Sequence, residues 1–237
     1  MTDASIQKYL NDLNAGKKTG HIIKTPLCSN VDLAKIWIRL PAISNTVVAG
    51  EKSYSAYLIK DSPGKYIGAV IDMVDDLHWF ITKTARKQGY LSEALREIVL
   101  PHIFKLRNEQ KITIDKGDIG SENYASSLGV AKRLGFKVVS DTQATELILK
   151  KSDFKNGVLG DRELPGFSSD RLFELKAHLQ FLSKSLSYIQ DEVELSLGET
   201  RFIKKAEKLS KEISELKETL HDEWAEWSNR INQHKSK

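Results

Sequence analysis

The last third of the chain has a spacing of apolar residues that allows few structures. From Leu172 to Val193 the apolar side chains recur in alternating steps of three and four residues, and a second such series follows Gly198. This heptad spacing is typical of helices that pack side by side, and the glycine between the series predicts a turn. We therefore expect a helical coiled-coil hairpin over residues 167–237. Its apolar seam predicts a homodimer formed through these C-terminal helices, and packing against the rest of the chain is the alternative.

The preceding part of the chain mixes the apolar alternation of strands with the spacing of helices. We place a domain at residues 1–156 and a linker, which is rich in glycine and contains Pro165, at residues 157–166. The order of its predicted elements indicates an α/β (α+β) fold with a mixed central sheet flanked by helices. Helices are predicted over 3–14, 31–40, 91–106 and 124–134, and strands over 19–27, 53–59, 66–74, 77–82, 111–114, 136–140 and 146–150.

Composition narrows the classes of function. Hydrophobic residues make up 40% of the 237 residues and charged residues 29%, as in ordinary globular proteins. Because no apolar run is long enough to cross a bilayer and the N-terminus lacks a secretory pattern, we expect a cytoplasmic protein without a membrane partner. The single cysteine, Cys28, excludes an internal disulfide, and the histidines lack metal-ligand spacing, so we predict no metal. The net charge of +4 contains no block of like charge, which argues against nucleic acid.

The segment over residues 81–95 carries the clearest chemical signal. A predicted strand leads through a polar loop and Gly89 into an amphipathic helix. Free amides at the first turn of a helix attract anions, and a glycine lets the backbone approach a phosphate. Arg86 and Lys87 add positive charge, so a diphosphate is a natural ligand, although a plain turn before a helix has the same pattern. The glycine spacing matches neither a P-loop nor a dinucleotide fingerprint.

Two motifs in this part of the chain resemble the GNAT family of acetyltransferases. The segment Arg86-Lys87-Gln88-Gly89-Tyr90-Leu91 resembles the family's pyrophosphate loop, R/Q-x-x-G-x-G/A. The segment over 127–136, SLGVAKRLGF, is similar to a helix and turn of the branch that acetylates ribosomal-protein N-termini. Both motifs occur in the family's order, and the resemblance covers about residues 20–150. The sequence departs from the family pattern at Leu91, at Ala131, where many members have a tyrosine acid, and at Tyr124, where an asparagine is expected.

The resemblance implies transfer of an acetyl group from acetyl-CoA to an amine, on a protein or peptide. It places Asp76 at the position of a base and makes Ser127 a partner for the leaving thiolate, although a turn aspartate and a helix-capping serine are the plain alternatives. It also implies a set of cofactor-binding residues: Phe80, Ile81, Thr82, Arg86, Lys87, Gln88, Gly89, Tyr90, Leu91, Ser92, Asn123 and Ser127. Two other functions remain open, namely a CoA-binding scaffold that works through the tail and an acetyltransferase for small amines.

Overall fold

A computed structural model describes residues 2–17, 21–37, 53–142, 144–155 and 164–235. The chain divides into two compact units, residues 1–163 and 164–237. Most of the predicted linker over 157–166 lies outside the described residues. None of the described helices is both long and apolar enough to cross a membrane.

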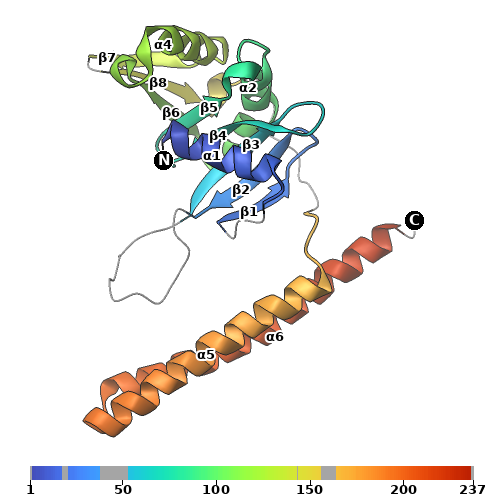
Figure 1. The fold of residues 1–237 in the computed structure, drawn as a ribbon, viewed down its shortest axis with the longest axis vertical. Coiled ribbons are helices and arrows are strands. Elements are labelled where there is room, and N and C mark those ends of the chain that lie inside the picture. Colours follow the sequence, from blue (N-terminus) through green and yellow to red (C-terminus); the bar gives the residue numbers. More distant parts are fainter. Residues whose placement is uncertain (1, 18–20, 38–52, 143, 156–163, 236–237) are drawn as a thin grey trace. The chain divides into compact units, whose positions relative to one another are not determined.

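The first unit is a mixed α/β structure, as predicted (Figure 1). Five antiparallel strands form one sheet in the order β1-β2-β3-β4-β5, and three more form a second antiparallel sheet in the order β6-β8-β7. The helices and strands follow the chain in this order: α1 (Asp3–Asn14), β1 (Ile22–Pro26), β2 (Val31–Ile36), β3 (Tyr54–Lys60), β4 (Tyr66–Asp72), β5 (Leu77–Ile81), η1 (Lys83–Ala85), α2 (Tyr90–Ala94), η2 (Leu95–Val99), α3 (Leu100–Ile103), β6 (Glu109–Ile114), α4 (Lys116–Arg133), β7 (Lys137–Asp141), β8 (Thr145–Lys150) and η3 (Lys151–Asp153).

The helix predicted over residues 31–40 is wrong in its described part. Residues Val31–Ile36 form β2, which pairs antiparallel with both β1 and β3. Val31, Ala34 and Ile36 are all buried, because both faces of this strand are covered. A strand buried on both faces loses the alternation of polar and apolar residues, and its sequence then cannot be told from a buried helix. Residues 38–40 lie outside the described residues.

Helix α1 covers one face of the five-stranded sheet (Figure 1). Thr2 caps its first turn, and Ile6 and Leu10 are buried against β2, β3 and β4. At its other end the Asn14 side chain donates to the carbonyl of Tyr66 and accepts from its N–H, each at 2.8 Å. These bonds fix α1 on the sheet and bring its first residues toward β5.

The other face of the sheet holds the larger core, which α2, α3 and the second sheet complete. The helical segment predicted over 91–106 runs from Tyr90 to Ile103, with a π-helical turn, η2, in its middle. Pro101 stands in the first turn of α3, directly after this wider turn, where a missing N–H is tolerated. In the turn between β3 and β4, Gly64 takes the left-handed conformation, with φ of 89°.

The second unit is a pair of antiparallel helices, α5 (Ser169–Leu197) and α6 (Arg201–Lys235). Gly198 lies in the turn between them with φ of 71°, as its position predicted. Near the open end of the hairpin, the indole N–H groups of Trp224 and Trp227 donate to the carbonyls of Phe167 and Leu164. The segment before α5 is thereby fixed on α6.

Candidate active site

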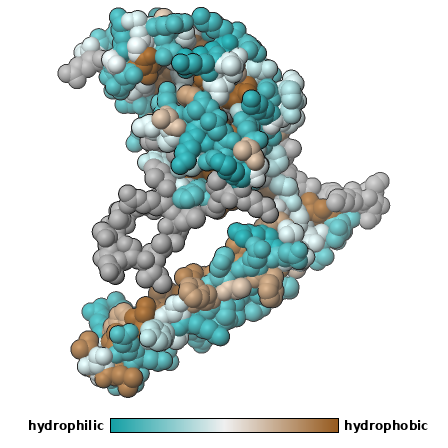
Figure 2. Space-filling view, in the orientation of Figure 1, coloured by the Kyte–Doolittle hydropathy of each residue, from teal (hydrophilic) through white to brown (hydrophobic). Residues whose placement is uncertain are grey.

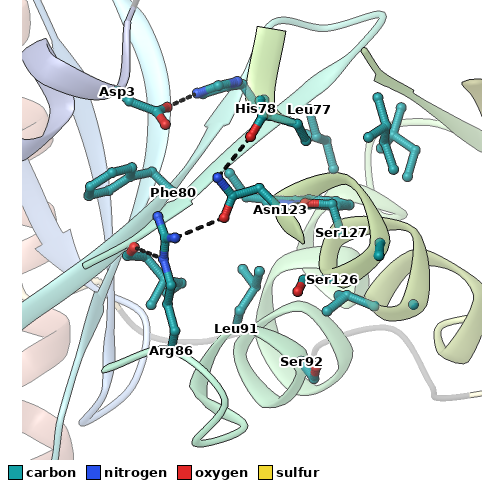
Figure 3. A pocket seen from close by; sticks show the side chains of 18 of the residues that line it. Asp3, Leu77, His78, Phe80, Arg86, Leu91, Ser92, Asn123, Ser126 and Ser127 are labelled. Carbon is teal, nitrogen blue, oxygen red and sulfur yellow. Dashed lines mark hydrogen bonds and ion pairs between the residues drawn. The ribbon is translucent and has the colours of Figure 1, made fainter. Parts of the chain in front are cut away.

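A cleft of about 920 Å³ opens where β5 and β6 diverge (Figure 3). The two strands belong to different sheets, and one side chain joins them at the start of β5. The Oδ1 atom of Asp76 accepts from the N–H of Leu77 at 2.8 Å and from the N–H of Thr113, near the end of β6, at 2.9 Å. Beyond this contact the space between the strands is lined by β5, the loop after it, α2 and α4. Asp76, the predicted base, therefore lines the cleft and also connects its two walls.

The wall formed by β5 is a sheet edge. The N–H of Thr82 donates to the carbonyl of Ile67, in register with the pairing of β4 and β5. Since backbone groups alternate in direction along an antiparallel strand, those of Trp79 and Ile81 point away from β4 toward the cleft. Among the predicted residues of this strand, Phe80 lines the cleft and also packs with the α1 core. Trp79 was not among the predicted residues, because only the pairing register reveals which backbone groups are free.

The loop after β5 has the local geometry of an anion site. Lys87 and Gly89 both have positive φ, 62° and 88°, and the first helical bond runs from the N–H of Glu93 to the carbonyl of Gly89. The amides over residues 90–92 therefore precede the intrahelical ladder. The positive φ of Gly89 is the reason that a glycine is favoured there. A Cβ atom at this position would meet no atom within 4 Å, so the space beside Gly89 is open.

Arg86 connects this loop to α4. Its Nη1 donates to Oδ1 of Asn123 at 2.8 Å and its Nε to the carbonyl of Ile81 at 3.2 Å (Figure 3). Asn123 follows a break in α4 at Gly120, whose φ of 75° and ψ of 162° are not helical. The hydroxyl of Tyr124 lies 2.6 Å from that of Thr145 on β8. Asn123, and not its neighbour, therefore reaches the loop.

The remaining residues predicted for the loop lie around it. Lys87 is exposed and its Nζ lies 3.3 Å from the carboxylate of Glu122 on α4. The Gln88 side chain bonds back to the carbonyl of Thr84 at 2.8 Å and does not line the cleft. Tyr90, Leu91 and Ser92 line the cleft from α2.

Ser127 lies across the cleft from β5, on α4. Its Oγ accepts from the indole N–H of Trp79 at 3.3 Å. A hydroxyl that accepts from an indole keeps its own O–H to donate elsewhere. The structure thus brings the two predicted catalytic residues, Asp76 and Ser127, to the same cleft.

The cleft also contains a pair that sequence reasoning missed. Nε2 of His78 on β5 lies 2.9 Å from Oδ1 of Asp3, at the start of α1 (Figure 3). The two residues are 75 positions apart, and no local pattern signals their contact. Both line the cleft on the side that α1 covers, so α1 contributes to the site as well as to the core.

No family model and no curated protein sequence matches the chain. Among solved structures, it has a likeness to an IAA acetyltransferase from Bacillus cereus, with 12% identity and a TM-score of 0.32 over 41% of this chain and 77% of the other. It has a similar likeness to a protein described as an acetyltransferase from Acinetobacter baylyi, with 12% identity and a TM-score of 0.33 over 42% of this chain and 64% of the other. The chain thus spans less than two thirds of the second structure. Neither likeness is strong enough to assign a function.

Proposed function

We propose that this chain is an acyltransferase that moves the acetyl group of acetyl-CoA to an amine, on a protein or peptide. The observation that supports this most is the pairing of an anion-binding loop with an open sheet edge along one cleft. Acetyl-CoA has matching parts, because its diphosphate is followed by an arm that contains two amides. The residues of the cleft can bind both parts in that order.

The diphosphate would lie against the amides of residues 90–92, in the open space beside Gly89. Arg86 would add a charged donor, which the bonds to Asn123 and Ile81 already hold near the loop. A side chain positioned before binding loses less conformational entropy when the ligand arrives. The amides of the arm would pair with the backbone groups of Trp79 and the N–H of Ile81, which point away from β4, as an added strand does.

The chemistry then needs few groups. The amine nitrogen attacks the thioester carbonyl, the C–N bond forms, the C–S bond breaks and the sulfur leaves as a thiolate. Asp76 is the candidate to receive the amine proton, because its Oδ1 is held by two N–H groups while its second oxygen can take a proton. Ser127 is the candidate to donate to the thiolate, since its Oγ already accepts from Trp79. Alignment of two bound reactants would supply much of the rate enhancement.

Isothermal titration with acetyl-CoA tests the cofactor site, using the wild type and Gly89→Glu. The substitution puts a negative charge where the diphosphate would lie. Gly64→Glu is the matched control, because Gly64 has nearly the same φ, equally open surroundings and a position outside the lining of the cleft. We expect micromolar binding by the wild type and by Gly64→Glu, and a loss of roughly 100-fold or more for Gly89→Glu. A wild type that does not bind acetyl-CoA, or equal losses in both variants, would contradict the proposal.

One observation favours a second candidate, a CoA-binding scaffold without turnover. Asp76 joins β5 to β6 through its Oδ1, which is a sufficient structural reason for an aspartate at this position. Release of free CoA separates the candidates: a set of peptides with free N-termini is incubated with acetyl-CoA, and thiol is measured. A third candidate, acetylation of small amines, predicts release with spermidine in place of peptides. Binding without release in either case would favour the scaffold.

A further inference from the structure

The seam between α5 and α6 has a cluster of serines in its middle, and the buried apolar residues of the hairpin are Leu172, Ile203 and Ala206. The Oγ atoms of Ser183 and Ser210 lie 2.9 Å apart, and each hydroxyl also reaches the carbonyl of the other residue, at 3.0 and 3.1 Å. Ser187 adds a third hydroxyl 3.1 Å from that of Ser210. Small side chains allow the two helices to approach closely at this level, and several larger apolar side chains lie exposed outside the seam.

Five of the exposed apolar side chains form an apolar face, defined here as Leu182 and Ile189 on α5 with Phe202, Leu209 and Leu216 on α6. Each of the five is between 43% and 53% exposed, so the neighbouring helix covers only about half of it. Figure 2 shows apolar residues along the hairpin. Within each helix the members of the face are seven residues apart, which is two turns.

Both helices direct their part of the apolar face to the same side of the hairpin. Leu182 precedes the seam residue Ser183 by one position, and Leu209 likewise precedes Ser210. One residue is a rotation of about 100° around a helix. Both helices are right-handed and face each other across the seam, but they run in opposite directions. One position back along either helix therefore leads from the seam to the same side of the hairpin, and Leu182 and Leu209 both lie on that side. The hairpin therefore has the form of half a four-helix bundle.

We propose that a second copy of this chain covers the apolar face, with each helix antiparallel to the same helix of the other copy. The twofold axis would cross the hairpin near Leu182 and Leu209, which lie at one level because Ser183 contacts Ser210. The paired heptads, residues 175–193 and 202–220, are each about 28 Å long and two helices are about 20 Å wide. Such a face has an area of roughly 600 Å², approaching the ~800 Å² that each partner contributes to a standard interface.

The charges beside the face complement each other under this twofold. On α6, Lys205 and Glu212 border the face on its outer side, one turn before and one turn after the level of Leu209. In an antiparallel pair of α6 helices, Lys205 of each copy would lie opposite Glu212 of the partner subunit, so the interface would contain this charge pair twice.

The described surface of the first unit has no counterpart to the apolar face. Its large exposed apolar side chains lie singly or in pairs on separate elements: Ile23 on β1, Met73 and Val74 in the turn before β5, Leu106 after α3, and Val138 and Val139 on β7. None of these groups forms a stripe two helices wide. A second copy of the hairpin has the same sequence and therefore presents the same apolar face.

Light scattering coupled to size-exclusion chromatography of the full chain tests the proposal. We expect twice the 26.8 kDa of one chain for the wild type. Leu182→Lys and Leu209→Lys each bring two ammonium groups together at the axis and should raise the dissociation constant by roughly 100-fold or more. The matched control is Leu195→Lys, on α5 but about 120° around the helix from Ile189 and 90% exposed, which should leave the dimer intact.

A charge exchange tests the antiparallel arrangement without touching the apolar residues. Lys205→Glu should raise the dissociation constant about 3- to 10-fold, and adding Glu212→Lys should restore it. Circular dichroism checks that each variant keeps its helices. A monomeric wild type, a dimer that survives both leucine substitutions with its affinity unchanged, or equal weakening by Leu195→Lys would overturn the proposal. Failure of the double charge variant to restore affinity would overturn the antiparallel arrangement.

Discussion

Replacing Asp32 by asparagine measures what a buried charge cluster contributes to the first unit. Asp32 on β2 is only 2% exposed, and it accepts from the Tyr66 hydroxyl at 2.5 Å and from Nζ of Lys60 at 2.7 Å. Nζ of Lys24 lies 3.4 Å away. Burial alone would raise the pKa of Asp32, but the hydrogen bonds from Lys60 and Tyr66 outweigh it and hold the pKa below its ordinary value of 3.8.

The size of the effect follows from what asparagine leaves behind. It keeps the shape of the side chain but not the charge, so Lys60, with a side chain only 15% exposed, loses its counter-ion. Lys24 is 40% exposed and can turn to water. Removing one partner of a buried ion pair costs about 3–5 kcal/mol, and because Lys60 is not fully enclosed we expect the lower end, ~3 kcal/mol. For a unit of this size that lowers Tm by about 6–12 °C.

The effect has a defined pH dependence. Because the pKa of Asp32 is lower in the folded chain than in the unfolded one, its contribution is complete above about pH 4, the unfolded value, and is lost as the pH falls through the folded pKa. The difference in stability between the wild type and Asp32→Asn should therefore be constant near neutral pH and shrink in acid, below about pH 4.

Thermal unfolding followed by circular dichroism, at neutral pH and in acid, measures both quantities. The matched control is Asp12→Asn, which removes a carboxylate 2.8 Å from Lys17, a lysine on the surface with 66% of its side chain exposed. Such a pair is worth about 0–1 kcal/mol. If Asp32→Asn costs no more than this control, or if its cost does not shrink in acid, the cluster does not stabilise the fold as argued.

Three further predictions concern the cleft. Arg86→Ala should weaken acetyl-CoA binding, measured by titration, about 10- to 150-fold because a charge-assisted hydrogen bond is lost. Asn123→Ala should weaken the binding less, since it removes only the hydrogen bond that holds Arg86 in place. Asp76→Asn retains an oxygen that accepts from both N–H groups, so Tm should hold while kcat/KM with the acceptor falls roughly 100-fold or more; unchanged turnover would exclude Asp76 as the base. Ser127→Ala should lower kcat about tenfold or more at constant KM, and a change in KM alone would assign it to binding.

Much of the fold follows from local patterns in the sequence. Helix α1, the order of the strands from β3 to β8 and the hairpin around Gly198 each have a periodicity or a turn that needs no knowledge of the rest of the chain. The loop at Gly89 was predicted for the same reason, because a strand, a glycine and a helix follow one another directly. Strand β2 was missed because its pattern depends on what covers both of its faces, which is decided by distant elements.

The candidate site divides in the same way. Ser127 was predicted from a motif and Asp76 from the position that the family resemblance implies for a base, and the fold brings both to one cleft. The contacts that orient the cleft join residues far apart: Arg86 with Asn123, Trp79 with Ser127, and Asp3 with His78. Their geometry depends on how α1 and α4 pack against β5, and side-chain type alone does not determine it.

The junction at Asp76 shows how one side chain can both create a cleft and remain available for chemistry. If β5 and β6 were joined by a continuous ladder of backbone hydrogen bonds, the groups of Trp79 and Ile81 would be used and no edge would face the cleft. A single carboxylate between Leu77 and Thr113 joins the strands only at their meeting point. Because one carboxylate oxygen of Asp76 accepts from both N–H groups, the other oxygen is not needed to join the strands. Structural and catalytic roles at this residue are therefore compatible, and Asp76→Asn separates them because it preserves the first and removes the second.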